Sequence, residues 1–125
     1  MWSPDGNELV GAPSDGYSST SASGKMQVWD AVTGENLGVL PGELPIWSPD
    51  SNRIAFTNNN KLSVWDISTM QEVFRFEIPD EDMLFYAPVW NPDSRHLAAY
   101  GVTSSSAYIH NMVYELGLKK EQRHV

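Results

Sequence analysis

The residues best able to do chemistry lack the spacing that chemistry requires. His96, His110 and His124 are 14 residues apart, whereas two zinc-binding histidines on one helix lie about four apart. The G-x-S-x-G pattern of a serine nucleophile does not occur, and Gly24-Lys25 lacks the earlier glycine of a phosphate-binding loop because position 19 is Ser19. The sequence therefore predicts a protein that is not an enzyme, with no catalytic residue, metal site or cofactor.

One run of acidic residues has the ligand type of a calcium site. Asp80-Glu81-Asp82 provides three adjacent carboxylates, and Ca²⁺ takes about six to eight oxygen ligands. The run has no glycine turn and no further acids at the spacing of a calcium loop. We therefore expect a solvated acidic turn, and the alternative is an electrostatic contact with a basic partner.

Composition limits the class of protein. The chain has 125 residues, 41% of them hydrophobic, no cysteine and a net charge of −8, which indicates one modest domain and excludes a disordered tail and disulfides. Its apolar runs are too short to insert into a membrane. The acidic charge argues against nucleic acid as a partner. We take the cytoplasm as the default location.

Two repeated motifs divide the chain. The first is Trp2-Ser3-Pro4-Asp5, Trp47-Ser48-Pro49-Asp50 and Trp90-Asn91-Pro92-Asp93, whose tryptophans are 45 and 43 residues apart. The second is Val28-Trp29-Asp30 and Val64-Trp65-Asp66, 36 residues apart. Repetition at this period indicates that the chain is built from similar structural units.

Short stretches of β character separate these motifs. They are Leu9-Val10, 54–57 and 97–100 after the Pro-Asp pairs, then 26–29 and 62–65, then 37–40 and 72–78. Proline presets φ in a turn, and aspartate accepts hydrogen bonds from nearby amides, so each Pro-Asp pair should reverse the chain between two strands. The predicted fold class is all-β.

This arrangement of motifs resembles the WD-repeat β-propeller family, from residue 2 to about residue 111. In that family each repeat supplies one four-stranded antiparallel blade. The resemblance implies that Trp2, Trp47 and Trp90 end the innermost strands. It also implies that Trp29-Asp30 and Trp65-Asp66 end third strands. Because Trp29 and Trp65 have a constant place in each repeat, we expect them to pack between adjacent blades rather than to stack on a ligand.

The sequence departs from the family pattern in two places. The Gly-His pair before the innermost strand is missing, since Gly42 is followed by Glu43, which implies that the side-chain network around that histidine is absent. In the third repeat His110-Asn111 takes the Trp-Asp position, so this repeat is either degenerate or misaligned. The motif Trp-Ser-Pro-Asp, followed in the second repeat by Ile-Ala-Phe, also resembles TolB-like bacterial propellers, which are the second choice.

The length predicts an open arc. Propellers have about four to eight blades, whereas 125 residues supply about 2.5 to 3, so the ring does not close. We expect a fragment of a longer propeller, with self-assembly into a ring as the alternative. The predicted divisions are repeats at 2–46, 47–89 and 90–116 and a basic tail at 117–125. Within 112–125, an outer strand at 112–116, a short helix and disorder all remain open.

The candidate binding residues lie in the connections on one face of the arc. The first repeat holds about nine extra residues near 13–24, which are either a flexible insertion or a partner-contacting loop anchored by Tyr17. The acidic run lies in another connection on the same face. The predicted protein-binding residues are Asp15, Tyr17, Glu43, Asp80, Glu81, Asp82 and Met83.

The resemblance implies a non-catalytic scaffold that binds other proteins. One alternative is a TolB-like envelope protein or a peptidase-associated propeller, and another is the sensor region of a kinase fused to repeats. The expected partners are other proteins, and either the remaining blades of a parent protein or further copies of the chain. Fold alone does not choose among these functions.

Overall fold

The computed structural model describes residues 1–11, 25–58, 61–77, 83–85, 88–103, 109–115 and 120–124, with side chains in 1–11, 25–58, 61–76 and 88–99. These residues form twelve β-strands. The described part of the chain contains no helix with the length and apolarity to cross a membrane. The prediction of an all-β fold is therefore confirmed.

The strands form three antiparallel sheets. Sheet 1 contains β1 (Glu8–Gly11), β2 (Lys25–Asp30) and β3 (Asn36–Pro41). Sheet 2 contains β4 (Glu43–Trp47), β5 (Arg53–Asn58), β6 (Lys61–Asp66) and β7 (Gln71–Glu77). Sheet 3 contains β8 (Met83–Phe85), β9 (Val89–Trp90), β10 (His96–Thr103), β11 (Ile109–Glu115) and β12 (Lys120–His124).

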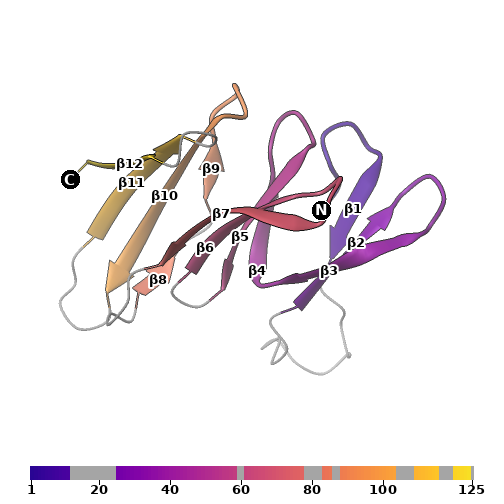
Figure 1. Ribbon diagram of the computed structural model, residues 1–125, viewed down its shortest axis with the longest axis horizontal. Coiled ribbons are helices and arrows are strands. Elements are labelled where there is room, and N and C mark those ends of the chain that lie inside the picture. The colour runs from indigo at the N-terminus through magenta and orange to yellow at the C-terminus, as the bar shows by residue number, and fades with distance from the viewer. Residues whose placement is uncertain are drawn as a thin grey trace.

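Each sheet is a simple meander, and the sheets lie side by side in chain order (Figure 1). In sheet 3, β8 and β9 both pair with β10. In sheet 1, Trp2 forms an isolated bridge with Leu9 at the place where β4 pairs with β5 in sheet 2. The three Pro-Asp turns lie along one edge of the stack, at the top of Figure 1. This is the architecture of a partial propeller.

The sheets are offset from the sequence repeats by one strand. β4 ends the first repeat in the sequence but pairs with β5, and β8 ends the second repeat but pairs with β10. Residues 120–124, assigned to a basic tail, form β12 and pair with β11. The alternatives for residues 112–116 need correction, because Met112–Glu115 is neither a helix nor the outer strand. It is part of β11, the third strand of its sheet.

The strand register also corrects the alignment of the third repeat. Leu9 pairs with Trp29 and Ile54 with Trp65, and Leu97, which has the same place after its turn, pairs with Tyr114. The Trp-Asp position is therefore Tyr114-Glu115, not His110-Asn111. The misalignment arose because Val113-Tyr114-Glu115 replaces Val-Trp-Asp by similar residues, and because the third repeat has a longer connection before this strand than the second.

Two apolar clusters hold the three sheets together. The cluster between sheets 1 and 2 contains Val10, Met26, Val28, Leu40, Trp47, Ile54, Phe56 and Ile67. The cluster between sheets 2 and 3 contains Ala55, Leu62, Val64, Phe76, Trp90, Leu97 and Ala99. Successive residues of β5 thus face opposite neighbours, as the two-residue period of a strand requires. Burial of sheet 2 from both sides is the main source of stability in this arrangement.

Gly42 lies at the tight junction between sheets 1 and 2. A Cβ built on Gly42 would lie 2.3 Å from Cδ2 of Phe56 and 2.5 Å from the main-chain oxygen of Thr57. A side chain here would collide with the main chain of β5, which cannot move independently of its sheet. The glycine that the sequence pattern marked only as half of a missing Gly-His pair therefore has a packing role of its own.

Gly42→Ala should lower the free energy of unfolding by about 1 to 3 kcal/mol, because the methyl group overpacks the junction. Urea unfolding followed by tryptophan fluorescence measures the loss. Gly34→Ala is the control: its Cβ would meet no atom within 4 Å, but φ is +78°, so the expected cost is about 1 kcal/mol. A Gly42→Ala variant as stable as the parent chain would contradict this packing.

Candidate functional site

The Pro-Asp turn of sheet 2 is built from two side chains. Oγ of Ser48 donates a hydrogen bond to Oδ1 of Asp50 at 2.6 Å and accepts one from the amide of Arg53 at 3.0 Å. Oδ1 of Asp50 also accepts a hydrogen bond from the amide of Asn52 at 3.0 Å. These bonds satisfy the polar groups of the reversal, so the aspartate serves the main chain, as the sequence predicted.

The same turn recurs in sheet 1, and a variant of it in sheet 3. Oγ of Ser3 donates to Oδ1 of Asp5 at 2.7 Å, whereas in sheet 3 the amides of Arg95 and His96 donate to Oδ1 of Asp93. The hydrogen bond from Ser3 lowers the pKa of Asp5, and the amide of Arg95 lowers that of Asp93. All three turns thus stabilise an ionised carboxylate.

Successive turns are joined by a hydrogen bond to a serine. The amide of Asp5 donates to Oγ of Ser51 at 3.0 Å, and the amide of Asp50 donates to Oγ of Ser94 at 3.0 Å. Ser51 and Ser94 follow the aspartates of the next turns and have φ of 66° and 60°. In each case the serine that follows the aspartate of one turn accepts a hydrogen bond from the amide of the aspartate in the preceding repeat.

A second hydrogen bond repeats between the same sheets. Nε1 of Trp47 donates to the main-chain oxygen of Met1 at 3.3 Å, and Nε1 of Trp90 donates to that of Ile46 at 3.1 Å. The acceptor is always the residue before the tryptophan of the preceding repeat. These tryptophans are buried, with exposed fractions of 5% and 7%, and each belongs to an apolar cluster between two sheets.

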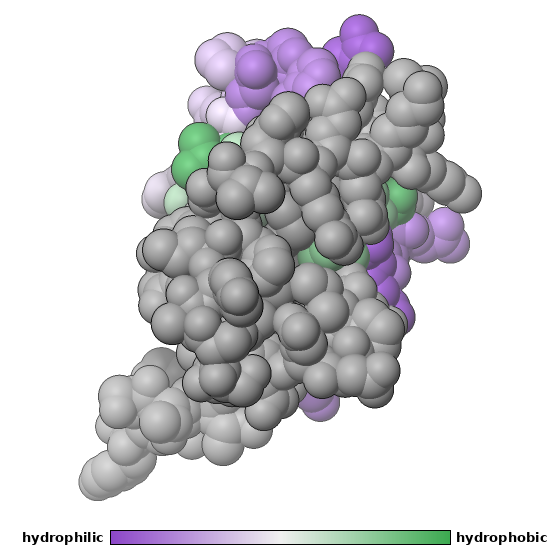
Figure 2. Space-filling model, turned by 90° about the vertical axis from the view of Figure 1, so that its left-hand side faces the viewer, coloured by the Kyte–Doolittle hydropathy of each residue, from purple (hydrophilic) through white to green (hydrophobic). Residues whose placement is uncertain are grey.

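The turn between β6 and β7 lies on the same edge of the stack. Oδ1 of Asp66 accepts hydrogen bonds from the amide and Oγ of Ser68, at 2.9 and 2.6 Å, and from the amide of Thr69 at 3.2 Å. The hydroxyl of Ser68 is the main cause of the lowered pKa of Asp66. We call this edge, with the three Pro-Asp turns and the Asp66 turn, the turn rim. Hydrophilic residues gather at the top of Figure 2, where this rim lies.

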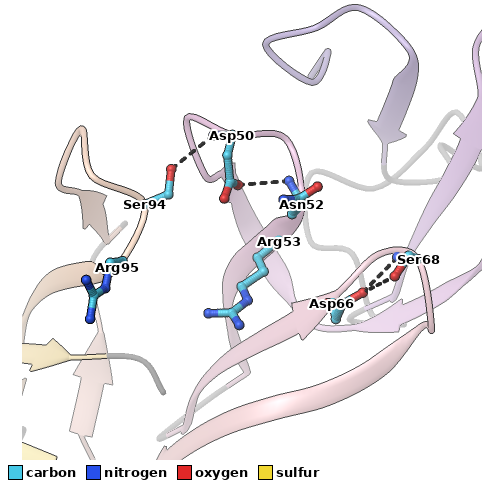
Figure 3. A pocket seen from close by; sticks show the side chains of 7 residues that line it. All are labelled: Asp50, Asn52, Arg53, Asp66, Ser68, Ser94 and Arg95. Atoms are coloured by element: carbon cyan, nitrogen blue, oxygen red, sulfur yellow. Dashed lines mark hydrogen bonds between the residues drawn. The ribbon is translucent and has the colours of Figure 1, made fainter. Parts of the chain in front are cut away.

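A polar pocket opens on the turn rim between sheets 2 and 3. Its volume is about 460 Å³, and it is lined by Asp50, Asn52, Arg53, Asp66, Ser68, Ser94 and Arg95. Figure 3 shows that these side chains come from three turns that are distant in sequence. The bond from Asp50 to Ser94 crosses the pocket wall and holds two of these turns together.

Arg53 is the central cation of this pocket. Its guanidinium points away from the Asp66 turn, toward the side of the pocket where Arg95 lies (Figure 3), and its charge contributes to the lowered pKa of both Asp50 and Asp66. Burial alone would raise the pKa of Asp50, but the hydrogen bonds from Ser48 and Asn52, together with Arg53, outweigh it. Among the described residues, no side chain forms a hydrogen bond or ion pair with the Arg53 guanidinium. The pocket therefore offers charge-assisted hydrogen bonds to a ligand.

The residue at the Arg53 position changes from one repeat to the next. Glu8 occupies it in sheet 1, opposite Asp30, and His96 in sheet 3. Nδ1 of His96 lies 2.6 Å from Oδ2 of Asp93. Oε2 of Glu8 is buried without a hydrogen-bond partner in the described structure, and burial raises the pKa of Glu8. One turn scaffold thus carries a glutamate, an arginine and a histidine at the same position.

Most of the predicted binding residues lie outside the part of the chain that the structure describes. They are Asp15, Tyr17, Asp80, Glu81 and Asp82. Glu43 is exposed at the start of β4, and Met83 begins β8, so these two residues lie at the edge opposite the turn rim. They stay predictions. Among the described residues, no group of three or more histidines and acids could hold a metal ion.

Several residues that line the pocket were not predicted as site residues from the sequence. Asn52, Arg53, Ser94 and Arg95 follow the Pro-Asp pairs that the analysis assigned to turn structure alone. The signal that could have identified them is the contrast between Asn7-Glu8, Asn52-Arg53 and Arg95-His96 at equivalent positions. Residues that shape a turn recur in each repeat, whereas residues that vary at a fixed place are open to function.

Comparison with solved structures shows the fold of part of a WD-type propeller. The chain matches a chain of the Mitotic Checkpoint Complex with a TM-score of 0.68 and 16% identity, over 99% of this chain and 38% of that one. It matches the C-terminal WD40 domain of Sif2 with a TM-score of 0.61 and 18% identity, over 98% of this chain and 32% of that one.

A peptidase structure is also similar. The acylaminoacyl peptidase of Pyrococcus horikoshii matches with a TM-score of 0.61 and 17% identity, over 80% of this chain and 20% of that one. No family model and no curated protein matches the sequence. The chain spans less than two fifths of each of the three solved chains. At these sequence identities the similarity establishes the fold alone.

Ser94→Ala should lower the free energy of unfolding by about 1 kcal/mol, because the amide of Asp50 loses its acceptor at a partly buried place. Serine and alanine both disfavour the positive φ of 60° at this position, so the loss of stability measures the contribution of the hydroxyl group. Ser68→Ala removes an exposed hydroxyl that bonds within one turn and should change stability by no more than about 0.5 kcal/mol. Equal urea midpoints for the two variants would contradict a bond that joins sheets.

Glu8→Gln should stabilise the chain at pH 7 and have no such effect near pH 4. Burial raises the folded pKa of Glu8 above that of an exposed glutamate, so folding disfavours the charged form. This cost is present above the folded pKa and disappears as the pH falls through it. Urea unfolding of both chains between pH 4 and 7 measures the difference. A difference that stays constant with pH would contradict a buried, uncompensated carboxylate.

Proposed function

We propose that this chain is part of a non-catalytic propeller scaffold that binds another protein through the turn rim. The observation that carries the proposal is the pocket around Arg53, whose guanidinium forms no hydrogen bond or ion pair within the described structure although its charge lowers the pKa of Asp50 and Asp66. A rigid pocket with a cation directed into it is suited to a carboxylate from a partner protein, because arginine binds carboxylates through paired hydrogen bonds.

The local charge favours an acidic side chain despite the negative charge of the whole chain. Asp50 and Asp66 already accept hydrogen bonds through Oδ1 within their own turns. Arg53 and Arg95 provide two guanidinium groups in the lining of one pocket. A long acidic segment would be repelled by the protein as a whole, so we propose a partner with a single acidic side chain among neutral ones.

The similar WD40 structures support a binding role only at the level of the fold. One of them belongs to a structure described as a checkpoint complex. Propellers present loops and turns from rigid sheets, which suits recognition rather than chemistry. The proposal for this chain therefore depends on its own pocket and not on the partners of those proteins.

A peptidase-associated propeller is the second candidate. It is favoured by the similarity to the Pyrococcus horikoshii peptidase. In that case the propeller would accompany a hydrolase domain, and the turn rim would face that domain. Hydrolysis of acylated peptides by a longer protein that contains this chain would support this candidate over a free scaffold.

The test places a photo-crosslinking amino acid at Asn52, which lines the pocket, and at Val73, which is exposed on β7. Partners recovered from Asn52 but not from Val73 define a candidate ligand segment, which is then made as a peptide. Arg53→Ala should weaken binding of this peptide at least about 10-fold, in line with the loss of one buried charge-assisted contact.

Arg75→Ala is the matched control for charge. Arg75 is an exposed arginine on β7 that pairs with Glu72 at 2.9 Å, away from the pocket lining. This variant should leave the affinity within about twofold, because exposed ion pairs contribute little. Equal loss in both variants would indicate attraction to overall charge and would contradict the pocket as the binding site, as would full affinity in Arg53→Ala.

A further inference from the structure

Sheet 1 presents an open face that is built like a buried one. Trp2, Leu9 and Trp29 occupy the positions that Trp47, Ile54 and Trp65 occupy in sheet 2, as the strand register shows. In sheet 2 these residues belong to the cluster against sheet 1 or pack on it. Trp2, in contrast, has an exposed fraction of 61%, against 5% for Trp47.

Sheet 3 presents the complementary face. Val89 and Ala98 pair with each other at the places where Ile46 and Ala55 pair in sheet 2. Ala55 belongs to the cluster against sheet 3, and Ile46 packs on that cluster. Val89 has an exposed fraction of 63%. The two ends of the stack therefore expose the two halves of the contact that the chain forms twice inside itself.

The polar groups of the two ends also correspond. Inside the chain, each tryptophan donates to the main-chain oxygen of the residue before the preceding tryptophan. By the same rule, Nε1 of Trp2 is the donor for a sheet placed before sheet 1, and the main-chain oxygen of Val89 is the acceptor for a tryptophan of a sheet placed after sheet 3. One copy thus carries both the donor and the acceptor.

The series of serine bonds ends in a way that suits the same contact. The position of Ser51 and Ser94 is Gly6 in the first turn, which offers no hydroxyl. At the other end, the amide of Asp93 donates to Oδ1 of Asn91 within its own turn, at 3.1 Å. A contact of sheet 3 with sheet 1 therefore needs no serine bond, because the amide is already satisfied where the acceptor is missing.

We propose that the open face of sheet 1 binds sheet 3 of a second copy of this chain, head to tail, with Trp2 of one copy donating to the main-chain oxygen of Val89 of the other. Two such contacts join two copies into a ring of six sheets, within the range of about four to eight known for propellers. This contact lies on the ends of the stack and is separate from the turn-rim pocket.

The test is the mass of the 125-residue chain in solution, measured by light scattering after size-exclusion chromatography and by sedimentation velocity. We expect a dimer. Trp2→Glu and Val89→Glu should each give a monomer, because each places an unpaired charge in an apolar contact. Trp2→Phe keeps an aromatic ring but loses the donor and part of the apolar area, and should weaken dimerisation by at least about 5-fold per contact, the effect expected for the hydrogen bond alone.

Val73→Glu is the control, since Val73 is exposed on β7 and outside both faces. It should remain a dimer. Circular dichroism of each variant shows whether its sheets are retained. We expect the Trp2 and Val89 variants to stay folded, because both side chains are exposed in the single chain. A monomeric parent chain, or a chain that extends into long polymers, would overturn the proposal.

A mixture of Trp2→Glu and Val89→Glu chains tests the head-to-tail geometry. Each variant keeps one intact face, and the two intact faces are complementary, so the mixture should form a dimer through a single contact although neither variant does so alone. A face that binds its own copy would not be rescued in this way. Failure of the mixture to associate would overturn the head-to-tail contact and would leave the peptide-binding experiment at Arg53 unaffected.

Discussion

The hydrogen bond from a tryptophan indole to the main chain of the preceding repeat fixes how the sheets stack. The apolar clusters on both sides of sheet 2 provide most of the favourable free energy, but hydrophobic contact has no direction. The bonds from Trp47 to Met1 and from Trp90 to Ile46 fix the position of one sheet relative to the next along the strand direction. In this position Ser51 and Ser94 lie 3.0 Å from the aspartate amides of the preceding turns.

Much of the fold could be predicted from the sequence because its determinants are local. A Pro-Asp pair reverses the chain by itself, and Trp47 and Trp90 mark the strand ends before the reversals. The third repeat was harder, because Tyr114-Glu115 keeps the character of Trp-Asp but not its letters, and a longer connection moves it out of phase. Strand pairing shows the equivalence at once, since it depends on neighbours across the sheet and not on distance along the chain.

The pocket could not be predicted in the same way. Asp50 and Asp66 belong to different turns of sheet 2, and Ser94 belongs to sheet 3, so their proximity depends on stacking between sheets. Each aspartate was predicted to serve its own turn, and the structure confirms this for both. Asp50 and Asp66 also line the pocket, which their local sequence does not indicate. Arg53 lines the same pocket because it is the first residue of β5, directly after the turn that contains Asp50.

Trp65 and Asp66 keep clear structural roles in this chain although the Gly-His pair is missing. Nε1 of Trp65 is buried without a hydrogen-bond partner in the described structure, a loss that costs about 1 to 3 kcal/mol for a buried donor. Its ring still packs against Phe56, with centroids 6.2 Å apart and planes tilted by 50°, and contributes to the cluster between sheets 1 and 2. Asp66 still closes its own turn without any histidine. The Trp65 indole therefore contributes apolar area to the cluster between sheets 1 and 2, and the Asp66 carboxylate stabilises its own turn. Neighbouring sheets are joined along the turn rim by the hydrogen bonds from the aspartate amides to Ser51 and Ser94, which need no histidine.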